Sequence, residues 1–385
     1  MAKRMVEEGR VRIEIPDPEE YRSVSGDYVP SLAEVFYNPQ MEFCRDISVS
    51  VAQVVSRELG GLRVCDPLAG SGIRGIRYAA EIEGVTDVLI NDRSRAAYEL
   101  MLRNVELNPS RVRIAAENDD ANVVMLRNRG RFNLIDLDPF GSPARFIESA
   151  CASVARTGMI ALTATDTGPL CGAHPRTCIR RYGAQPLRTE YCHELGIRTL
   201  IGFCQRVAGK YDLALEPVLV HSTRHYFRIY LRAKRSASLA DTIMRGQGYI
   251  SHCFSCGRRW TFRGLPRVDG CECGGAPAHS GPLWTGPLWN RDFLENVIRD
   301  LSGRTYRQRE AEINMLSLCL MESGGPPTFY DINALASMAG VSPPRIKWVI
   351  ECLRKSGRFA SRTHFSPTGI RTEAGIDELM ALLQR

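Results

Sequence analysis

The chain has 385 residues, which is long enough for two domains. Of these residues 44% are hydrophobic, enough to bury a sizeable core, which argues against a disordered protein. Its apolar runs are shorter than the roughly 20 residues of a membrane span, and its N-terminus lacks the apolar run of a signal peptide, so we expect a cytoplasmic protein without membrane contact. The net charge of +7 rests on 50 basic residues of which only five are Lys, which favours a nucleic-acid partner, although an Arg-rich genome would give the same composition.

The first 60 residues form a polar segment that becomes helical after Asp46. From 61 to 165, short apolar strands alternate with helices, the pattern of a doubly wound parallel sheet. The expected strands are 62–68, 87–92, 111–118, 132–138 and 158–166, and the expected helices are 72–83, 95–107, 121–129 and 144–154. Residues 216–235 then predict two more strands around a turn, added antiparallel at the end of the sheet.

The composition changes near residue 246, where Gly, Pro and Cys become frequent, and helices resume from Asp292. We therefore expect two domains, 1–245 and 246–385. In the second domain, 331–340 and 342–357 predict a helix-turn-helix-like pair, followed by a strand-like stretch.

A glycine-rich turn follows the first strand of the sheet. Gly70, Gly72 and Gly75 fit the G-x-G-x-x-G pattern of a nicotinamide dinucleotide site, but enzymes that use S-adenosylmethionine share this geometry. Asp66 before the glycines favours S-adenosylmethionine, because a carboxylate there can reach its cationic end and would repel a pyrophosphate. The alternative role for Asp66 is that of a helix cap.

Acidic residues also end the next two strands. Asp92 stands at the spacing where a carboxylate holds the two hydroxyls of a ribose. Asp119 and Asp120 follow the third strand, where one carboxylate can accept from an adenine amino group beside the Ala121 backbone and the other can cap a helix. Open sheets bind ligands at the carboxyl ends of their strands, so these residues predict a nucleoside-binding edge.

The fourth strand ends in Asp138, Pro139 and Phe140. An exocyclic amine on a base is a poor nucleophile because its lone pair is delocalised into the ring. The Asp138 carboxylate, with or without the Pro139 carbonyl, can accept the amine N–H groups and direct that lone pair toward a methyl donor, while Phe140 stacks on the base. Many DNA and RNA amino-methyltransferases carry an [Asn/Asp/Ser]-Pro-Pro-aromatic motif here, of which Asp-Pro-Phe-Gly is a shortened relative. The alternatives are a turn with a core Phe and an Asp138 that only caps the next helix.

Thirteen Cys residues are present, most of them in apolar segments where a thiol acts as a small hydrophobe. Only Cys253-x-x-Cys256 and Cys271-x-Cys273 are spaced for metal binding. Four thiolates on two tight turns suit a closed, tetrahedral structural Zn²⁺ site, with a reduced, metal-free loop as the alternative. A catalytic metal is not expected.

Several strings along nearly the whole chain resemble the tRNA guanosine-26 N2-dimethyltransferase family of archaea and eukaryotes. They are EGR, FYNPQMEFCRDISV, SGIRGIRYA, NDRS, DDAN, DLDPFGSP, TATDTGPLCG, RYGA and SRTHFSPTGIRT. The resemblance implies transfer of one or two methyl groups from S-adenosylmethionine to the exocyclic N2 of guanine 26 in tRNA. It also implies a Rossmann-like class I methyltransferase domain and a C-terminal α+β, tRNA-binding domain with a zinc knuckle and a winged-helix-like end.

The resemblance also assigns roles to individual residues. We infer no obligatory protein partner from the sequence. The resemblance implies cofactor contacts for Arg45 and Arg74, ribose and adenine contacts for Asp92, Asp120 and Ala121, and an acid–base role for Asp138. The paired Cys residues resemble the zinc knuckle of the family, although the second pair is Cys-x-Cys.

The C-terminal helix pair is the part of the chain that we expect to hold the tRNA body, with a dimer or interdomain surface as the alternative. Its basic residues are Arg345, Lys347, Arg354, Lys355 and Arg358. Three other functions stay open at this point: methylation of rRNA or DNA amines, RNA binding without catalysis, and nicotinamide-dependent oxidoreduction.

Overall fold

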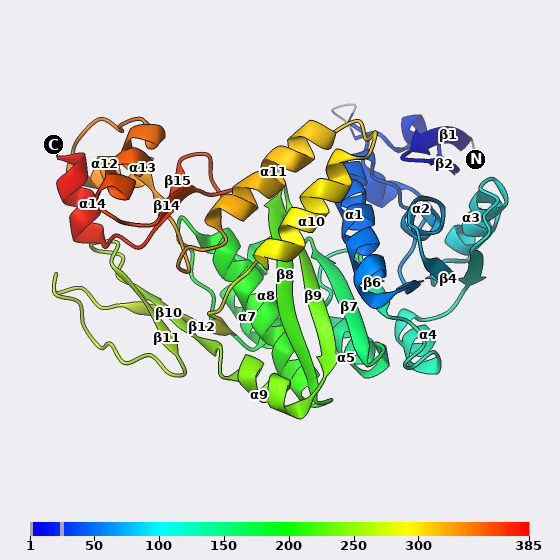
Figure 1. The fold of residues 1–385 in the computed structure, drawn as a ribbon, viewed down its shortest axis with the longest axis horizontal. Helices are drawn as coiled ribbons and strands as arrows, with labels where there is room; N and C mark the ends of the chain where they lie inside the picture. Colours follow the sequence, from blue (N-terminus) through cyan, green and yellow to red (C-terminus); the bar gives the residue numbers. More distant parts are fainter. Residues whose placement is uncertain (1–2, 24–26, 385) are drawn as a thin grey trace. The chain divides into compact units, whose positions relative to one another are not determined.

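The computed structural model describes residues 3–23 and 27–384 (Figure 1). Contacts within the chain divide it into two compact units, each assembled from several segments. Unit 1 comprises Met1–Thr163, Tyr230–Arg235 and Glu295–Ile313, and unit 2 comprises Ala164–Ile229, Ser236–Leu294 and Asn314–Arg385. The predicted domain boundary at residue 246 falls between α9 (Ala237–Met244) and β10 (Gln247–His252), and it stays a prediction.

A seven-stranded sheet in the order β5-β4-β3-β6-β7-β9-β8 organises the fold. Strands β3 to β7 pair in parallel, and the order reverses between β3 and β6, as in a doubly wound sheet. The strands are β3 (Leu62–Asp66), β4 (Val85–Asn91), β5 (Arg113–Glu117), β6 (Leu134–Leu137), β7 (Thr157–Ala164), β8 (Leu213–Thr223) and β9 (Tyr226–Arg235). The predicted α/β fold with a large sheet is therefore confirmed.

The helices of the first half of the chain lie close to their predicted positions. They are α1 (Glu42–Leu59), α2 (Ile73–Glu81), α3 (Arg95–Glu106), α4 (Ala121–Arg127) and α5 (Ala144–Ser153). Ser94 caps α3 by accepting from the Ala97 N–H, as its sequence position favours. The start of α1 differs from the prediction, because a 3-10 turn at Pro39–Met41 leads directly into the helix four residues before Asp46.

The sequence analysis described the N-terminal residues only as polar and did not predict the hairpin that they form. Strands β1 (Lys3–Glu8) and β2 (Val11–Pro16) form an antiparallel hairpin. The alternation of apolar and polar residues in β2 explains it, because Val11, Ile13 and Ile15 all point to one face of the strand. These three side chains are buried in one cluster with Ile73 and Ile76 of α2.

Unit 2 contains two small sheets and the remaining helices. One sheet has the order β11-β10-β12 and the other β13-β15-β14. Their strands are β10, β11 (Arg259–Arg263), β12 (Ala278–Trp284), β13 (Tyr330–Asp331), β14 (Ala360–Arg362) and β15 (Gly369–Thr372). The helices are α6 (Thr167–Leu170), α7 (Pro175–Tyr182), α8 (Cys192–Gly209), α9, α12 (Ile332–Ala339), α13 (Ile346–Lys355) and α14 (Ile376–Leu383). The predicted C-terminal helix pair corresponds to α12 and α13.

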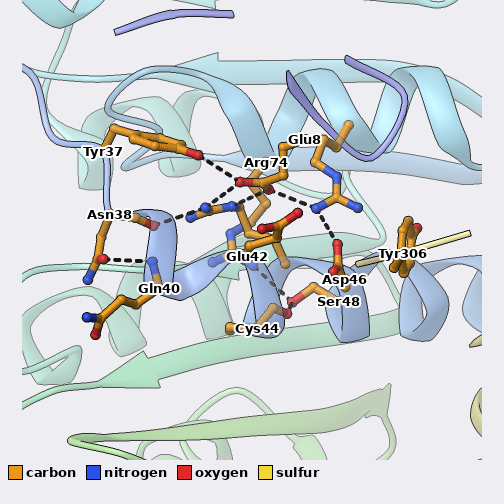
Figure 2. A network of polar contacts seen from close by, with 12 residues as sticks. Glu8, Tyr37, Asn38, Gln40, Glu42, Cys44, Asp46, Ser48, Arg74 and Tyr306 are labelled. Carbon is orange, nitrogen blue, oxygen red and sulfur yellow. Dashed lines mark hydrogen bonds and ion pairs between the residues drawn. The ribbon is translucent and has the colours of Figure 1, made fainter. Parts of the chain in front are cut away.

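Two further helices are α10 (Arg291–Ser302) and α11 (Arg309–Glu322), and most of α10 and the start of α11 lie in the last segment of unit 1, Glu295–Ile313. This segment reaches a network of buried charges whose centre is Arg77 of α2. The Arg77 guanidinium has no exposed surface and lies 2.8 Å from Glu8, 2.6 Å from Asp46 and 2.6 Å from Glu81. Figure 2 shows the part of this network around Glu8 and Asp46.

Glu312 of α11 adds a fourth buried carboxyl group to the network. Its side chain is fully buried and hydrogen-bonds the Asp46 carboxyl. Burial first, and then the charge of Asp46, raise the pKa of Glu312 to about 9. The pair therefore holds a proton at neutral pH, which lets one carboxyl donate to the other.

This proton makes stability depend on pH. In the unfolded chain Glu312 has a pKa near 4.5, against about 9 in the folded state, so the folded state binds the extra proton between these values and loses stability as the pH rises through them. Glu312→Gln imitates the protonated side chain. We expect the melting temperature of the wild type to fall relative to that of Glu312→Gln as the pH rises from about 5 to about 9, measured by thermal unfolding across that range.

Glu310→Gln, which changes an exposed neighbour on α11, is the control and should follow the wild type. A gap between the Glu312→Gln and wild-type melting temperatures that stays constant with pH would contradict the buried proton.

Candidate active site

Four neighbouring parallel strands carry acidic residues at their carboxyl ends. Asp66 ends β3, and Asp92 and Asp138 directly follow β4 and β6, while Asp119 and Asp120 lie just beyond β5. Because these strands are adjacent and parallel, their ends lie along one edge of the sheet. The structure thus places the predicted acidic residues along one edge.

The glycine-rich loop after β3 is fixed by Asp92 and by close backbone packing. The two Asp92 carboxylate oxygens accept from the Gly70 N–H (3.0 Å) and the Ser94 N–H (2.9 Å). Gly70 has a φ of +54°, and a Cβ atom at this position would lie 3.1 Å from the Phe36 carbonyl oxygen. A residue with a side chain would be strained here, so the tight turn after β3 requires glycine at position 70.

Asn91 was missed by the sequence analysis. It is fully buried at the end of β4, and its amide group donates to the carbonyls of Pro67 and Asp119, at 3.0 Å each. Its Oδ1 accepts from the Asp119 N–H at 3.0 Å. Asn91 therefore ties the loops after β3 and β5 to each other. The signal in the sequence is an amide residue at the end of a buried apolar strand, next to Asp92.

The two acidic residues after β5 have different partners. Asp120 caps α4 by accepting from the Asn122 N–H (2.9 Å), and buried Ala121 is the first residue of that helix. Asp119 accepts from the Asp120 N–H (2.8 Å) and pairs with Arg127 (2.5 Å). The backbone hydrogen bond first, and then Arg127, lower the pKa of Asp119. Asp119 is thus engaged by an Arg, whereas Asp120 stays at the helix N-terminus.

Asp66 lies beneath the glycine-rich loop and is only 1% exposed. Burial and then Asp136 raise its pKa to about 8 against the opposing effect of Arg74, so the carboxyl group is mostly protonated at neutral pH. It interacts with the Gly75 N–H in the first turn of α2, whose N-cap residue is Gly72, while its Oδ2 has no hydrogen-bond partner. Attraction to a cationic ligand would require this group to release its proton as the ligand binds.

An ion pair between Arg74 and Asp138 occupies the centre of the edge. Nη2 of Arg74, on α2, donates to Asp138 Oδ2, and Nη1 donates to Ser48 Oγ at 2.9 Å. Burial disfavours the guanidinium charge, but Asp136 and Asp138 outweigh it and raise the pKa of Arg74. The Asp138 side chain remains 23% exposed, so one carboxylate is both anchored and open to a ligand.

A further layer of hydrogen bonds fixes this ion pair. The Tyr78 hydroxyl donates to Asp136 at 2.6 Å, and Asp136 lies 3.8 Å from Arg74. On the other side, the Ser48 hydroxyl lies 2.9 Å from the hydroxyl of Tyr230 and donates to a backbone carbonyl of α1. Arg74 is therefore held from both sides.

Pro139 and Phe140 follow Asp138 in opposite environments. Pro139 is buried, whereas the Phe140 ring is 66% exposed and meets the Phe36 ring edge to face at 4.5 Å. The alternative of a core Phe is therefore wrong. The alternative helix cap is wrong as well, because the residue at the N-cap of α5 is Pro143.

Arg45 lies on α1 and binds the N-terminal hairpin. It forms two hydrogen bonds of 2.6 Å with the Glu8 carboxylate and one of 3.0 Å with the Asn38 carbonyl. Burial by itself would raise the pKa of Glu8, but Arg45 and then Arg77 lower it to about 2. The structure thus gives Arg45 a charged partner inside the protein, and its predicted cofactor contact stays a prediction.

The four predicted metal ligands in unit 2 come together as a four-cysteine cluster. The thiols of Cys253 and Cys256 lie in the turn between β10 and β11, and those of Cys271 and Cys273 precede β12. All four sulfurs lie within 4.8 Å of one another, and the Cys253–Cys273 and Cys256–Cys271 pairs are 3.5 Å apart. Tetrahedral Zn–S bonds of about 2.3 Å require sulfurs about 3.8 Å apart, so this cluster fits Zn²⁺.

Comparison with known proteins agrees with this geometry. The sequence model of the N2,N2-dimethylguanosine tRNA methyltransferase family matches residues 9–384. The chain belongs to this family. The tRNA (guanine(26)-N(2))-dimethyltransferase of Methanothermobacter thermautotrophicus is 41% identical over 98% of each chain. That of Methanosphaera stadtmanae is 39% identical, over all of this chain and 97% of the relative.

A solved structure of a family member is also similar. The complex of Trm1 from Pyrococcus horikoshii with S-adenosyl-L-methionine matches with a TM-score of 0.87 and 36% identity, over 98% of this chain and 99% of that one. Membership of this family decides between the two interpretations of the glycine-rich turn in favour of the methyltransferase. Within residues 3–23 and 27–384, every helix is too short or too polar to span a bilayer.

Proposed function

We propose that the acidic edge of the sheet performs the reaction of the N2,N2-dimethylguanosine tRNA methyltransferase family: transfer of one or two methyl groups from S-adenosylmethionine to the N2 amine of guanine 26 in tRNA. The observation that carries the proposal is the partly exposed Asp138 carboxylate, which Arg74 anchors next to the exposed ring of Phe140. A buried carboxyl in a purely structural ion pair would need neither the exposure nor the aromatic ring.

The cofactor would lie across the ends of β3, β4 and β5. Asp92 accepts the ribose hydroxyls, and Asp120 with the Ala121 backbone binds the adenine. We choose Asp120 over Asp119 because Arg127 already engages Asp119. The tight turn at Gly70 would let the cofactor approach the backbone, and the buried Asp66 precedes this turn at the end of β3.

Arg74 is the residue between the cofactor and the catalytic carboxylate. Two of its nitrogens already bind Ser48 and Asp138, and a guanidinium has five N–H donors, so it can also bind the cofactor carboxylate. Arg45, which Glu8 holds in place, would lie near the same carboxylate end of the cofactor. Through these contacts, Arg74 would place the cofactor carboxylate beside Asp138, while Ser48 also holds Arg74 in position.

When bound, S-adenosylmethionine supplies a methyl group on a cationic sulfur. Asp138 accepts one N–H of the guanine amine, the Pro139 carbonyl accepts the other, and Phe140 stacks on the base. The nitrogen lone pair then forms the N–C bond while the C–S bond breaks, and the cationic amine gives its proton to Asp138. Since tRNA position 26 lies within the folded RNA, the base must leave its stack to reach Phe140.

The C-terminal helices would hold the body of the tRNA. The α12–α13 pair and the small sheet β13-β15-β14 resemble a winged helix, and α13 exposes Arg345, Lys347, Lys355 and 41% of the Trp348 side chain. Basic side chains beside an exposed aromatic ring suit phosphates and an unstacked base. Arg354, by contrast, donates to the Ala360 carbonyl at 2.9 Å and supports the fold.

The four-cysteine cluster would hold a structural Zn²⁺ ion. All four coordination positions are taken by sulfur, so the ion has no open position for chemistry. It would join the β10–β11 turn to the loop before β12.

Asp138→Asn tests the catalytic proposal. The amide keeps one acceptor but cannot take a proton, and general-base contributions are typically about 10²–10⁴-fold, so we expect kcat to fall by at least that factor while the Kd for S-adenosylmethionine changes little. Single-turnover methylation of unmodified tRNA, with the product nucleoside identified by mass spectrometry, measures this loss.

The melting temperature should fall as well, because Arg74 loses its charged partner, and rates are therefore measured well below it. Asp241→Asn, an exposed Asp on α9, is the matched control and should keep full activity. Near-normal turnover by a folded, cofactor-binding Asp138→Asn protein would end the catalytic role.

Cys253→Ser tests the structural zinc. We expect the variant to bind about one Zn²⁺ fewer per chain and to melt at a lower temperature, because the metal-binding free energy contributes to folding, while the affinity for S-adenosylmethionine is unchanged. Metal analysis and thermal unfolding measure both effects. Cys352→Ser, a thiol outside the clusters found among the described residues, should keep the wild-type zinc content. If Cys253→Ser had the zinc content and melting temperature of the wild type, a structural Zn²⁺ ion at this cluster would be excluded.

The combined change Lys347→Gln and Lys355→Gln tests the tRNA surface. We expect weaker tRNA binding and a smaller dependence of log Kd on log salt, by a slope of up to about 2 for two lost phosphate contacts, with unchanged cofactor binding. Arg12→Gln, an exposed Arg of unit 1, is the control. If the tRNA Kd and its salt slope equal those of the wild type, these residues face something other than tRNA.

A further inference from the structure

Cys171, Cys192 and His193 form a second group of metal-ligand side chains in unit 2. One ligand atom from each, two sulfurs and one imidazole nitrogen, lies within 4.8 Å of the other two, and all three residues are half-buried. Cys171 directly follows α6, while Cys192 and His193 open α8. The proposed reaction and the four-cysteine cluster use none of them.

Cys192 is the first residue of α8, and its sulfur lies next to that of Cys171. The backbone N–H groups of the first turn of α8 and the charge of Arg188 also lie near this sulfur. The two sulfurs are therefore adjacent, and one of them lies among hydrogen-bond donors.

His193 is positioned in the way that metal-binding imidazoles usually are. Its Nδ1 lies 3.1 Å from the hydroxyl of Ser222, and its ring meets Phe227 edge to face at 5.6 Å between centroids. A hydrogen bond at one ring nitrogen fixes the orientation of the ring and leaves the other nitrogen, Nε2, for an ion.

Another candidate cluster in unit 2 lacks these properties. Cys319, Glu322 and His364 also lie within 4.8 Å of one another. However, the Glu322 carboxylate already receives two hydrogen bonds from buried Arg371, at 3.0 and 2.9 Å. A metal cation beside that guanidinium would be repelled, so this cluster functions as a buried ion pair.

We propose that Cys171, Cys192 and His193 bind one Zn²⁺ ion, with the fourth position left to water or a small ligand. Two thiolates and one imidazole suit Zn²⁺, and three protein ligands leave the site open, unlike the closed four-cysteine cluster. The ion would join the end of α6 to the first turn of α8. A disulfide between the two thiols is the competing arrangement, and it would leave His193 without a role.

Zinc counting on the full-length protein tests the proposal. Protein purified with a phosphine reductant and freed of loose metal should contain about one Zn²⁺ more per chain than Cys192→Ser and His193→Ala, each measured by mass spectrometry of the metal. Cys178→Ser, a buried thiol of α7 in neither cluster, should match the wild type. Because the zinc content of each variant is compared with that of the wild type, the result does not depend on what the four-cysteine cluster binds.

Cobalt provides a second measurement. In the wild type, Co²⁺ bound by two thiolates and an imidazole should add a sulfur-to-metal absorption band that Cys253→Ser retains and Cys192→Ser loses. Equal zinc contents in the wild type, Cys192→Ser and His193→Ala would overturn the proposal. Zinc contents that stay equal, together with two fewer free thiols in the wild type purified without reductant, would assign the pair to a disulfide instead.

Discussion

The position of α2 depends on the burial of Arg77. A guanidinium without exposed surface is tolerated only when carboxylates surround it, and Glu8, Asp46 and Glu81 do so from the N-terminal hairpin, α1 and α2 itself. Removing one partner of such a buried pair typically costs about 3–5 kcal/mol, so the three elements are held in one arrangement.

The same helix carries the active-site ion pair. Arg74 and Arg77 are three residues apart, so they lie on neighbouring parts of the helix surface. Anchoring Arg77 therefore also sets the distance of Arg74 from Asp138. This explains why the hairpin of residues 3–16, which contains none of the proposed catalytic residues, is built into the active-site unit: Glu8 binds both Arg45 and Arg77.

The sequence predicted the strand ends well because each parallel strand places its carboxyl end at a known edge. Asp66, Asp92 and Asp138 could be placed without any knowledge of side-chain packing. The partners of charged residues could not be predicted in this way. The sequence did not reveal that Arg45 binds Glu8, a contact over 37 residues of sequence that only the folded hairpin creates. Asn91 was missed because its role is to bind backbone groups of two loops. The cluster of Cys171, Cys192 and His193 was missed because its first ligand lies far from the other two in the sequence.

The return of the chain to unit 1 has a consequence for its synthesis. Tyr306 donates to Glu81 at 2.7 Å, Asp300 pairs with Arg57 of α1 at 3.3 Å, and Glu312 meets Asp46, all from one segment near α1 (Figure 1). A ribosome must therefore make most of the chain before the charges of α1 and α2 gain their last partners. Until then, Arg57, Asp46 and Glu81 lack these partners, whereas the ion pairs of Arg77 with Glu8, Asp46 and Glu81 need only the first 81 residues. Completion of this charged network is thus a late event, coupled to the synthesis of residues far beyond the last strand of the sheet.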